Sequence, residues 1–409
     1  MRGCPLGIDI PGFIRFLREG DATLALSRIK EKNPLPAVCG RICTAPCEVE
    51  CVFHEEKSAI GIRHLERFAS DFGRLKAARP KITPNHKKIA VIGSGPSGLC
   101  ASYDLARQGY QVTIFEALTE PGGILRYGIP EFRLPKKILD QEIFDLKMLG
   151  VNITTNAFVG QNVSVKEIFA KGFEVVLLAM GAGGAGCCEL PGTHLAGVYY
   201  AQEFLMRVNL WGAEHFPRAP IPAALGNKIV VLGANYAALD CARSVLRLGK
   251  QATVVFSGLE EDIEIYPEDL KIAKEEGIVL EPMAKPIEII SSDNQSVSGL
   301  KCQRLDFVDG DEQLGWKLEL VPDSEFTLQA DTVLLADGTG RGTTLSNHFS
   351  ELQLNDDGTI WVEAQSAMTS VKGVFACGNL VSGAGFVVDA MASGKQAAVK
   401  IQQFLNRKS

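Results

Sequence analysis

The sequence predicts an α/β protein in which two Rossmann-like dinucleotide-binding domains follow a small α-helical domain. Three observations indicate this architecture. One apolar strand leads into Gly93-x-Gly95-x-x-Gly98, and a later one leads into Gly233-x-Asn235-x-x-Ala238. Five cysteines crowd into the first 51 residues of the 409-residue chain. The expected domains are the helical domain at 1–80, a discontinuous first Rossmann domain at 84–221 and 339–409, and an inserted second one at 222–338.

Composition and charge exclude several classes of protein. Hydrophobic residues make up 46% of the chain and charged residues 22%, as in ordinary globular proteins. The net charge of −6 does not favour binding to nucleic acid. No apolar run reaches the ~20 residues of a membrane span, and the N-terminus has no apolar signal region. We therefore expect a cytoplasmic location, where the 11 cysteines stay reduced rather than form a disulfide framework.

The first 80 residues are expected to be helical, with an interruption where most of the cysteines lie. Asp9-Ile10-Pro11 is typical of a helix start with proline in the first turn, and Gly20-Asp21 starts a second helix. A third helical pattern carries Leu65, Phe68 and Phe72. Between the second and third helices the sequence reads Cys39-x3-Cys43-x3-Cys47-x3-Cys51, and Cys4-Pro5 stands ahead of them all.

Several thiolates brought together suit an iron–sulfur cluster or zinc. In ferredoxin-like runs the cysteine followed by proline ligates a different cluster from its neighbours, so Cys4 can join the later cysteines at one cluster. The alternatives are a zinc site and plain packing of buried thiols. No Cys-x2-Cys pair of the zinc-knuckle kind occurs, which favours the iron–sulfur cluster.

The first glycine motif has the full context of a dinucleotide site. The expected strand Ile89–Ile92 precedes the motif, and a helix from Ser97 to about Gln108 follows it. Gly95 lets the backbone approach a pyrophosphate at the positive end of that helix. The next strand, Gln111–Phe115, ends in Glu116, which is placed to accept a hydrogen bond from a ribose hydroxyl.

Other stretches suit the same cofactor. The pair Gly122-Gly123 allows another close approach of backbone, and Arg133 either pairs with a phosphate or forms a surface salt bridge. Near the end of the chain a strand reaches Gly378-Asn379, whose amide can bond a ribityl hydroxyl or phosphate. A helix begins near Phe386-Val387-Val388, and its positive end would stabilise negative charge on a reduced flavin ring.

The second motif departs from the standard pattern. Asn235 replaces the second glycine, so its side chain must point away from any pyrophosphate. The strand after the motif, Ala252–Phe256, ends in Ser257-Gly258, which offers neither an acid for a ribose nor an arginine for a 2′-phosphate. Acidic residues that would oppose a phosphate follow at Glu260, Glu261 and Asp262. We expect a nucleotide here, with a vestigial fold as the alternative.

These residues resemble the small (beta) subunit of glutamate synthase over essentially the whole chain. The amino-terminal half of dihydropyrimidine dehydrogenase and the large subunit of electron-bifurcating transhydrogenases are similar too. The stretches that carry the resemblance are Asp9-Ile10-Pro11-Gly12-Phe13-Ile14, Asn33-Pro34-Leu35-Pro36-Ala37-Val38-Cys39-Gly40-Arg41, Leu65-Glu66-Arg67-Phe68, Tyr127-Gly128-Ile129-Pro130-Glu131-Phe132-Arg133-Leu134-Pro135 and Gly373-Val374-Phe375-Ala376.

The resemblance implies FAD in the first fold, at Gly93, Gly95, Gly98, Glu116, Gly123, Ile124, Arg133, Gly378 and Asn379. Ser97, Gly122, Leu125, Val387 and Val388 complete the candidate flavin-binding set. A nicotinamide nucleotide is implied in the second fold near Gly233, Asn235, Ala238 and Gly338, to which Tyr236 and Ser257 are added as candidates. For a [4Fe-4S] cluster the implied ligands are Cys4, Cys43, Cys47 and Glu66. Cys51 matches a ligand of a second cluster, and Cys51 or Cys39 could replace Glu66 as fourth ligand.

The chain differs from that family in three respects. It lacks the Cys-x2-Cys-x4-Cys run that the family usually has before Cys4-Pro5, so the second cluster would lack three ligands. The tandem arginine, or arginine–lysine, after the second-fold strand is Ser257-Gly258, which leaves open whether NADH or NADPH is used. The usual Gly-Asp near the end is Gly378-Asn379.

The expected function is that of an electron-transfer flavoprotein subunit. NAD(P)H and FAD would exchange hydride, and single electrons would pass through the cluster to a partner subunit, as in an electron-bifurcating transhydrogenase complex. Hydride transfer needs stacking and distance, so no catalytic acid or base is predicted. The alternatives are a glutamate synthase small subunit that feeds an amidotransferase, and a relay scaffold whose second fold no longer binds nucleotide. A disulfide reductase is disfavoured, because Cys187-Cys188 is adjacent and no Cys-x2-Cys pair exists.

Overall fold

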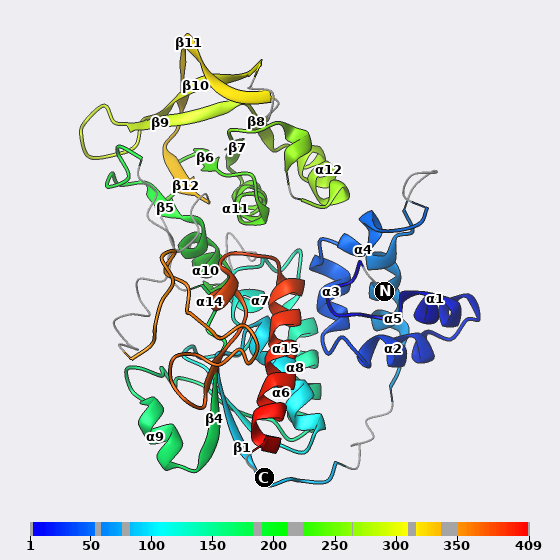
Figure 1. Cartoon of the computed structure of the whole chain (residues 1–409). Coiled ribbons are helices and arrows are strands. Elements are labelled where there is room, and N and C mark those ends of the chain that lie inside the picture. Colours follow the sequence, from blue (N-terminus) through cyan, green and yellow to red (C-terminus); the bar gives the residue numbers. More distant parts are fainter. Residues whose placement is uncertain are drawn as a thin grey trace. The chain divides into compact units, whose positions relative to one another are not determined.

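The computed structural model describes residues 3–53, 59–75, 82–182, 190–211, 224–263, 265–309, 316–336 and 351–407. The chain forms two compact units (Figure 1). Unit one comprises Met1–Arg126, Phe132–Gly184 and Thr339–Ser409, and unit two comprises Tyr127–Glu131 and Ala185–Gly338. Among the residues in these ranges that are described, no helix is both long and apolar enough to cross a membrane.

Unit one begins with the expected helical domain. Asp9 caps the first helix by accepting the N–H of Gly12, and Pro11 lies in its first turn, as predicted. The cysteine-bearing segment differs from the expectation of a simple interruption. It forms two short helices, each of which begins at a proline, because proline has no N–H to leave unpaired at that position. The helices are α1 (Ile10–Arg18), α2 (Ala22–Lys30), α3 (Pro36–Ile42), α4 (Pro46–Val49) and α5 (Ile62–Phe72).

The rest of unit one is a Rossmann-like fold around a five-stranded parallel sheet of order β13-β4-β1-β2-β3. Its last strand in the chain, β13, lies beside β4, so the chain returns to the first fold as predicted. The strands are β1 (Lys88–Ile92), β2 (Gln111–Phe115), β3 (Asn152–Thr154), β4 (Phe173–Leu178) and β13 (Val374–Ala376). The helices are α6 (Pro96–Arg107), α7 (Ile124–Tyr127, which reaches into unit two), α8 (Lys136–Met148), α9 (Val165–Ala170), α14 (Asn379–Ser382) and α15 (Val387–Arg407).

The long helix α15 packs against α6 at backbone distance (Figure 1). A Cβ atom added at Gly394 of α15 would lie 2.2 Å from the carbonyl oxygen of Ser97 on α6. The two helices could not approach this closely without the glycine, because any side chain at position 394 would force them apart. Lys395 then pairs with Asp104 of α6 at 2.6 Å, both side chains being mostly buried.

A buried carboxylate on α8 joins the helical domain to the first Rossmann-like fold. Glu142 accepts the N–H of Ala37, in the first turn of α3, at 2.9 Å. The residue before that turn, Leu35, supplies no side-chain cap, so Glu142 satisfies a donor that the helix itself leaves unpaired. Lys30 of α2 reaches Glu142 at 3.3 Å and Asp145 at 2.6 Å. Burial opposes the charge of Lys30, but the attraction of Glu142 and Asp145 outweighs it and raises the lysine pKa.

Unit two contains a second five-stranded parallel sheet, of order β5-β12-β6-β7-β8. Its first strand, β5, pairs with β12, so the unit starts earlier than the boundary expected at residue 222. The sheet consists of β5 (Val198–Tyr200), β6 (Lys228–Leu232), β7 (Gln251–Val255), β8 (Val279–Glu281) and β12 (Thr332–Leu335). Its helices are α10 (Ala201–Trp211), α11 (Tyr236–Arg247), the short 3₁₀ turn η2 (Glu260–Asp262) and α12 (Pro267–Glu275).

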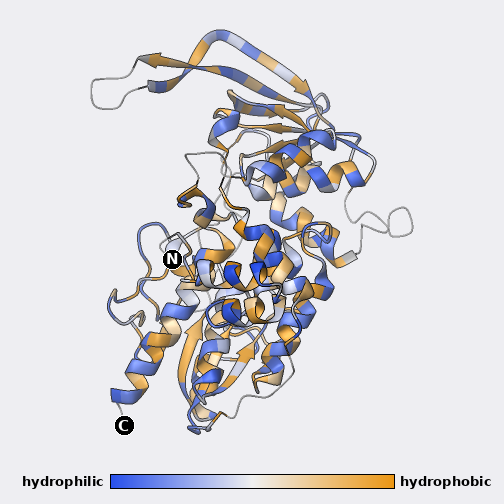
Figure 2. Cartoon of the chain, turned by 90° about the vertical axis from the view of Figure 1, so that its right-hand side faces the viewer, coloured by the Kyte–Doolittle hydropathy of each residue, from blue (hydrophilic) through white to orange (hydrophobic). Residues whose placement is uncertain are grey.

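An antiparallel sheet that the sequence analysis did not anticipate completes unit two. Its order is β11-β10-β9, with β9 at Ala284–Ile290, β10 at Gly299–Asp309 and β11 at Trp316–Gln329. Hydrophilic and hydrophobic residues alternate along its long strands (Figure 2), as expected where one face of a sheet is covered and the other is open to water.

We predict that Gly394→Ala destabilises unit one strongly, because the new methyl group meets backbone rather than a side chain that can move. A loss of about 3 kcal/mol, or roughly 6–12 °C in Tm, is expected. Calorimetry of the FAD-loaded protein would measure it. Gln396→Ala, on the exposed side of the same helix, is the matched control and should change little. Equal Tm values for the two variants would contradict the close helix contact.

We predict that Glu142→Ala loosens the helical domain while the Rossmann fold keeps its flavin. The change leaves the Ala37 N–H without its acceptor and removes a carboxylate from Lys30, which should cost about 2–4 kcal/mol. Limited proteolysis should then cut the first 80 residues faster than in the parent protein. Lys147→Ala, on the exposed face of α8, serves as control, and equal cleavage rates in both variants would argue against this role for Glu142.

Candidate functional site

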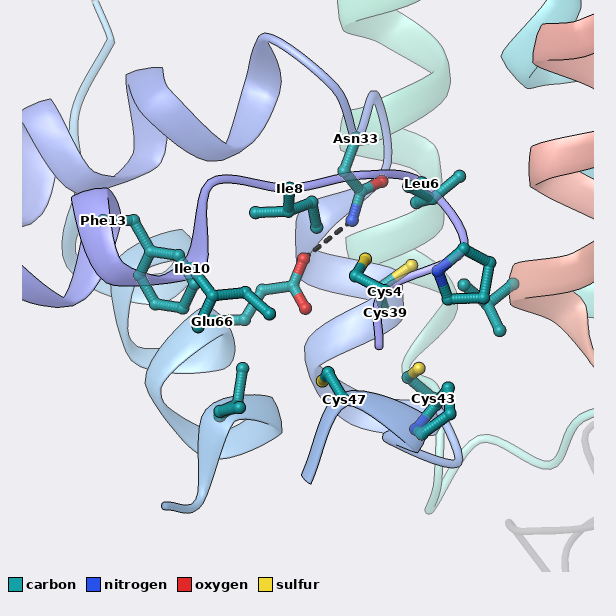
Figure 3. A pocket seen from close by; sticks show the side chains of 14 residues that line it. Cys4, Leu6, Ile8, Ile10, Phe13, Asn33, Cys39, Cys43, Cys47 and Glu66 are labelled. Carbon is teal, nitrogen blue, oxygen red and sulfur yellow. Dashed lines mark hydrogen bonds between the residues drawn. The ribbon is translucent and has the colours of Figure 1, made fainter. Parts of the chain in front are cut away.

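Four cysteine thiols of the helical domain lie around one cavity (Figure 3). They come from three places in the sequence: the N-terminal stretch, α3 with the residue after it, and α4. The cavity is lined by Cys4, Cys39, Cys43 and Cys47, by Glu66 and Asn33, and by the apolar side chains of Pro5, Leu6, Ile8, Ile10, Phe13, Pro46, Ile62 and Val388. The structure therefore brings Cys4, Cys43, Cys47 and Glu66 together, as the sequence predicted.

Close packing of α3 on α5 places the thiols opposite Glu66. A Cβ atom at Gly40 would lie 2.6 Å from the backbone of Arg67, so only glycine permits this approach. Arg41 of α3 adds an ion pair with Asp71 of α5 at 2.7 Å. Because Gly40 follows Cys39 and Arg67 follows Glu66, this contact sets the two sides of the cavity.

The short helix α4 is fixed by its own acidic residue. The buried carboxylate of Glu48 accepts the N–H of Arg63 at 2.8 Å and thereby caps the start of α5. Arg63 in turn donates to the carbonyl oxygen of Cys43 at 3.2 Å. These bonds hold the Cys43–Cys47 loop against the helix that carries Glu66.

The cavity strongly disfavours negative charge as long as no cation lies in it. Burial raises the pKa of Cys43 to about 12, against the hydrogen bond from Ala45, and raises that of Cys47 to about 12. Burial likewise raises the pKa of Cys4, and raises that of Glu66 to about 8 although Asn33 donates to it. A positively charged iron–sulfide core would supply the charge that stabilises these groups as thiolates.

The geometry around Cys43 suits a cluster ligand. Its Sγ accepts the N–H of Ala45 at 3.3 Å, the kind of bond that tunes the potential of iron–sulfur centres. Ala45 itself has φ of 54°, a left-handed conformation that costs energy for a residue with a Cβ. In the described part of the chain no three Cys, His, Asp or Glu side chains converge on the position of a single metal ion. The thiols instead surround a shared space.

The three candidates for the fourth ligand, Glu66, Cys39 and Cys51, have different surroundings. Glu66 lies in the cavity wall, with its Oε1 accepting from Asn33 at 2.7 Å (Figure 3). Cys39 also lines the cavity, but its Sγ lies 3.6 Å from the sulfur of Met391 on α15. Cys51 is outside the set of lining residues. Its role as a ligand stays a prediction.

The first turns of α15 join the cluster cavity to the flavin fold. Val388, predicted as a flavin-binding residue, lines the cluster cavity. Met391, one turn further on, touches Cys39. Ser393 of the same helix accepts the N–H of Gly378 at 2.9 Å, so a helix that contacts the Gly378-Asn379 segment also forms part of the cluster wall.

Two glycine loops of the first fold meet where a flavin pyrophosphate is expected. A Cβ atom at Gly123 would lie 2.8 Å from the Cα of Gly95, whereas a Cβ at Gly95 would find only the Ala179 oxygen, at 4.0 Å. Gly95 thus borders open space rather than packed protein, which fits the close approach of a ligand. The N-cap of α6 at Gly95 carries no side-chain cap bond, so the start of that helix is available to an anion.

Glu116 directly follows β2, as predicted, and its hydrogen bonds connect the two glycine loops of the first fold. Its carboxylate accepts the N–H and hydroxyl of Ser94 and the N–H of Leu118, and the Ser94 hydroxyl accepts the N–H of Gly122. The carboxylate is 5% exposed. Its bond to a ribose hydroxyl stays a prediction, and Ser94 is a participant that the sequence analysis missed, because only its neighbours belong to the motif.

A buried amide oxygen without a partner supports the flavin site independently. Oδ1 of Asn379 is buried and has no hydrogen-bond partner, while its Nδ2 lies 3.4 Å from the Gly385 oxygen. Such an acceptor costs free energy unless a ligand donor reaches it. Both the open space at Gly95 and this amide fit FAD.

Of the other flavin candidates, Leu125 and Ser97 are buried, and Ile124, Arg133 and Val387 are at least partly exposed.

The second fold repeats the backbone of the first with a different loop. Asn235 caps α11: its Oδ1 accepts the N–H of Ala238 at 3.0 Å, and its Nδ2 donates to the Ala336 oxygen at 2.9 Å. The side chain is therefore turned onto the helix end and the neighbouring strand. Tyr236 follows it, and its hydroxyl donates to Asp269 at 3.0 Å. Gly338 and the pair Cys187-Cys188 lie outside the described residues.

Comparison with known proteins gives matches over nearly the whole chain. Residues 87–394 match the family model "Pyridine nucleotide-disulphide oxidoreductase", and residues 1–78 match that of dihydropyrimidine dehydrogenase domain II with its 4Fe-4S cluster. The "NADP(+)-dependent formate dehydrogenase subunit beta" of Moorella thermoacetica is 32% identical over 100% of this chain and 60% of its own length. The "Glutamate synthase [NADPH] small chain" of Escherichia coli is 31% identical over 98% of this chain and 87% of its own length.

The "NADPH-Fe(3+) oxidoreductase subunit beta" of Geobacter sulfurreducens is 32% identical, with 99% of this chain and 63% of that protein covered. The chain thus spans less than two thirds of several of these relatives. Among solved structures, Mycobacterium tuberculosis FprA in complex with NADPH superposes with a TM-score of 0.62 at 20% identity, covering 79% of this chain and 85% of that one. This likeness concerns the fold alone.

These matches confirm the predicted resemblance, the two Rossmann-like folds and the cofactors FAD, NAD(P)H and [4Fe-4S]. The chain belongs to the pyridine nucleotide-disulphide oxidoreductase family and carries an N-terminal 4Fe-4S domain of the dihydropyrimidine dehydrogenase type.

Proposed function

We propose that this chain exchanges hydride between NAD(P)H and FAD and passes single electrons through its [4Fe-4S] cluster to a partner subunit. The observation that carries the proposal is the position of α15. The helix begins two residues after Gly385, whose oxygen accepts from Nδ2 of Asn379 while Oδ1 of that amide has no partner, and Val388 of the helix lines the cluster cavity. One secondary-structure element would therefore border both the cluster and the flavin within unit one.

The chain's own residues would hold the two groups and shield them. Cys4, Cys43 and Cys47 would ligate the cluster, and the apolar wall that includes Ile8 and Phe13 would exclude water from it. Glu116 and Ser94 would keep the glycine loops open for the flavin pyrophosphate. When bound, FAD supplies the conversion between two-electron hydride chemistry and one-electron transfer.

Glu66 is our proposed fourth ligand. It faces the cavity, whereas the Cys39 thiol already contacts Met391 and Cys51 is outside the lining set. Asn33 donates to one carboxylate oxygen of Glu66 and would orient the other toward the cluster.

The partner is proposed from the relatives. Several of them are named as subunits or as a small chain, which supports a partner subunit in general. We propose a multi-subunit complex, such as an electron-bifurcating transhydrogenase. A glutamate synthase small subunit is the second candidate, because the chain covers 87% of the Escherichia coli small chain and only 60–63% of the longer beta subunits.

Anaerobic titration tests the electron path. NADH or NADPH should bleach the flavin of the purified holoprotein, and the cluster should then become reduced, as followed by electron paramagnetic resonance. Reduction of the flavin by dithionite but by neither nucleotide would instead support the relay scaffold. Flavin bleaching with a cluster that stays oxidised until dithionite is added would break the proposed link between flavin and cluster.

Substitution of single cysteines tests the ligand set. Cys43→Ser should lower the iron and sulfide content strongly, while the flavin stays bound and is still reduced by the nucleotide. Cys51→Ser is the matched change outside the cavity and should keep the full iron content. Loss of iron in the Cys51 variant, with retention in the Cys43 variant, would overturn the assignment.

A further inference from the structure

We propose that the nucleotide site of the second fold selects NADH over NADPH. The inference rests on the proposed function, since it concerns the donor nucleotide of that reaction. It comes from the residues at the carboxyl end of β7, where the adenosine ribose lies in dinucleotide-binding folds and where the 2′-phosphate distinguishes NADPH from NADH.

The two folds of this chain can be compared position by position. In the first, Ile92 pairs with Phe115, and in the second, Leu232 pairs with Val255. The next residue donates its N–H to the adjacent strand in both folds: Glu116 to Thr154, and Phe256 to Glu281. Phe256 therefore occupies the position of Glu116.

Phe256 offers no polar group to a ribose or a phosphate. Its side chain is 2% exposed and belongs to the hydrophobic core of unit two. The exposed residue after it is Ser257, whose hydroxyl is neutral, and Gly258 follows. A 2′-phosphate carries about two negative charges and is usually met by arginine or lysine, and none of these three residues supplies a cation.

The segment that follows adds negative charge at the same edge. The turn η2 begins with the acidic residues Glu260 and Glu261. It is held in place, since Ile263 and Ile265 pack against the hydrophobic core to which Phe256 belongs. The hydroxyl of Tyr236, in the first turn of α11, also accepts the N–H of Tyr266 at 2.9 Å and so ties the end of this segment to the nucleotide-binding helix.

Two cations near this edge are already engaged by carboxylates. Lys274 of α12 pairs with Glu260 at 2.5 Å. Arg304 pairs with Glu281, at the end of β8, and its guanidinium stacks 4.1 Å from the centre of the Phe326 ring. Binding of a 2′-phosphate to either cation would compete with its carboxylate, whereas a 2′-hydroxyl meets no such cost.

The test is the affinity of the FAD-loaded protein for NAD⁺ and NADP⁺, measured by isothermal titration calorimetry, together with anaerobic flavin reduction by NADH and NADPH. We expect NAD⁺ to bind at least about tenfold more tightly, which corresponds to about 1.4 kcal/mol. The preference should shrink as salt is raised, because screening weakens the repulsion. Equal or tighter binding of NADP⁺ would overturn the inference and leave the proposed function standing.

A charge-reversing variant sharpens the test. The double variant Ser257→Arg with Glu260→Gln should tighten NADP⁺ binding by about tenfold and change NAD⁺ binding little. Thr327→Arg with Glu325→Gln makes the same change of charge on β11 and should alter neither affinity. If the two double variants bind NADP⁺ alike, this edge does not decide specificity. If neither nucleotide binds the parent protein or reduces its flavin, the proposed function fails as well.

Discussion

The backbone contact between α15 and α6 is the constraint on which both redox sites of unit one depend. Gly394 brings α15 within reach of the Ser97 carbonyl, at the start of the helix whose N-terminus we propose binds the flavin pyrophosphate. The same helix carries Val388 and Met391 to the cluster cavity. A shift of α15 by the width of one methyl group would therefore displace Val388 and Met391 at the cluster cavity. It would also disturb the start of α6, because packed helices transmit such displacements.

The cluster cavity shows how stability is given up for a cofactor. Three thiols and a carboxyl group lie among apolar side chains, where burial raises the pKa of each of them. Ala45 adds a left-handed backbone conformation between two of the thiols. Buried neutral thiols cost little, so without the cluster the costs fall on Glu66 and on the Ala45 backbone, and ligation would offset them. The Glu142 network then ties that domain to the flavin fold independently of the cluster.

The sequence predicts those features that are local along the chain. Both strand–glycine–helix units, the cap at Asp9, Glu116 and the grouping of Cys4, Cys43, Cys47 and Glu66 correspond to what the structure shows. It does not predict contacts made across the fold, such as Cys39 with Met391 or Asn33 with Glu66, since no spacing encodes them. Nor does it predict the antiparallel sheet β9–β11 or the strand β5, because β5 is three residues long and is defined by its pairing with β12.

The two Rossmann-like folds show that one backbone can serve two cofactors through a few edge positions. The two folds share the pairing register of their first strand pairs, β1–β2 and β6–β7, and the helix that follows the glycine motif. The motifs alone therefore say little about which nucleotide binds. The differences lie at the second motif position, Gly95 against Asn235, and after the second strand, Glu116 against Phe256. In the first fold Gly95 borders open space, and the Glu116 carboxylate holds the glycine loops in place through its hydrogen bonds. In the second, Asn235 caps the helix itself and the apolar ring of Phe256 replaces the acid, so we expect the nucleotide to be held mainly at the helix end, beside an acidic turn that would oppose a 2′-phosphate.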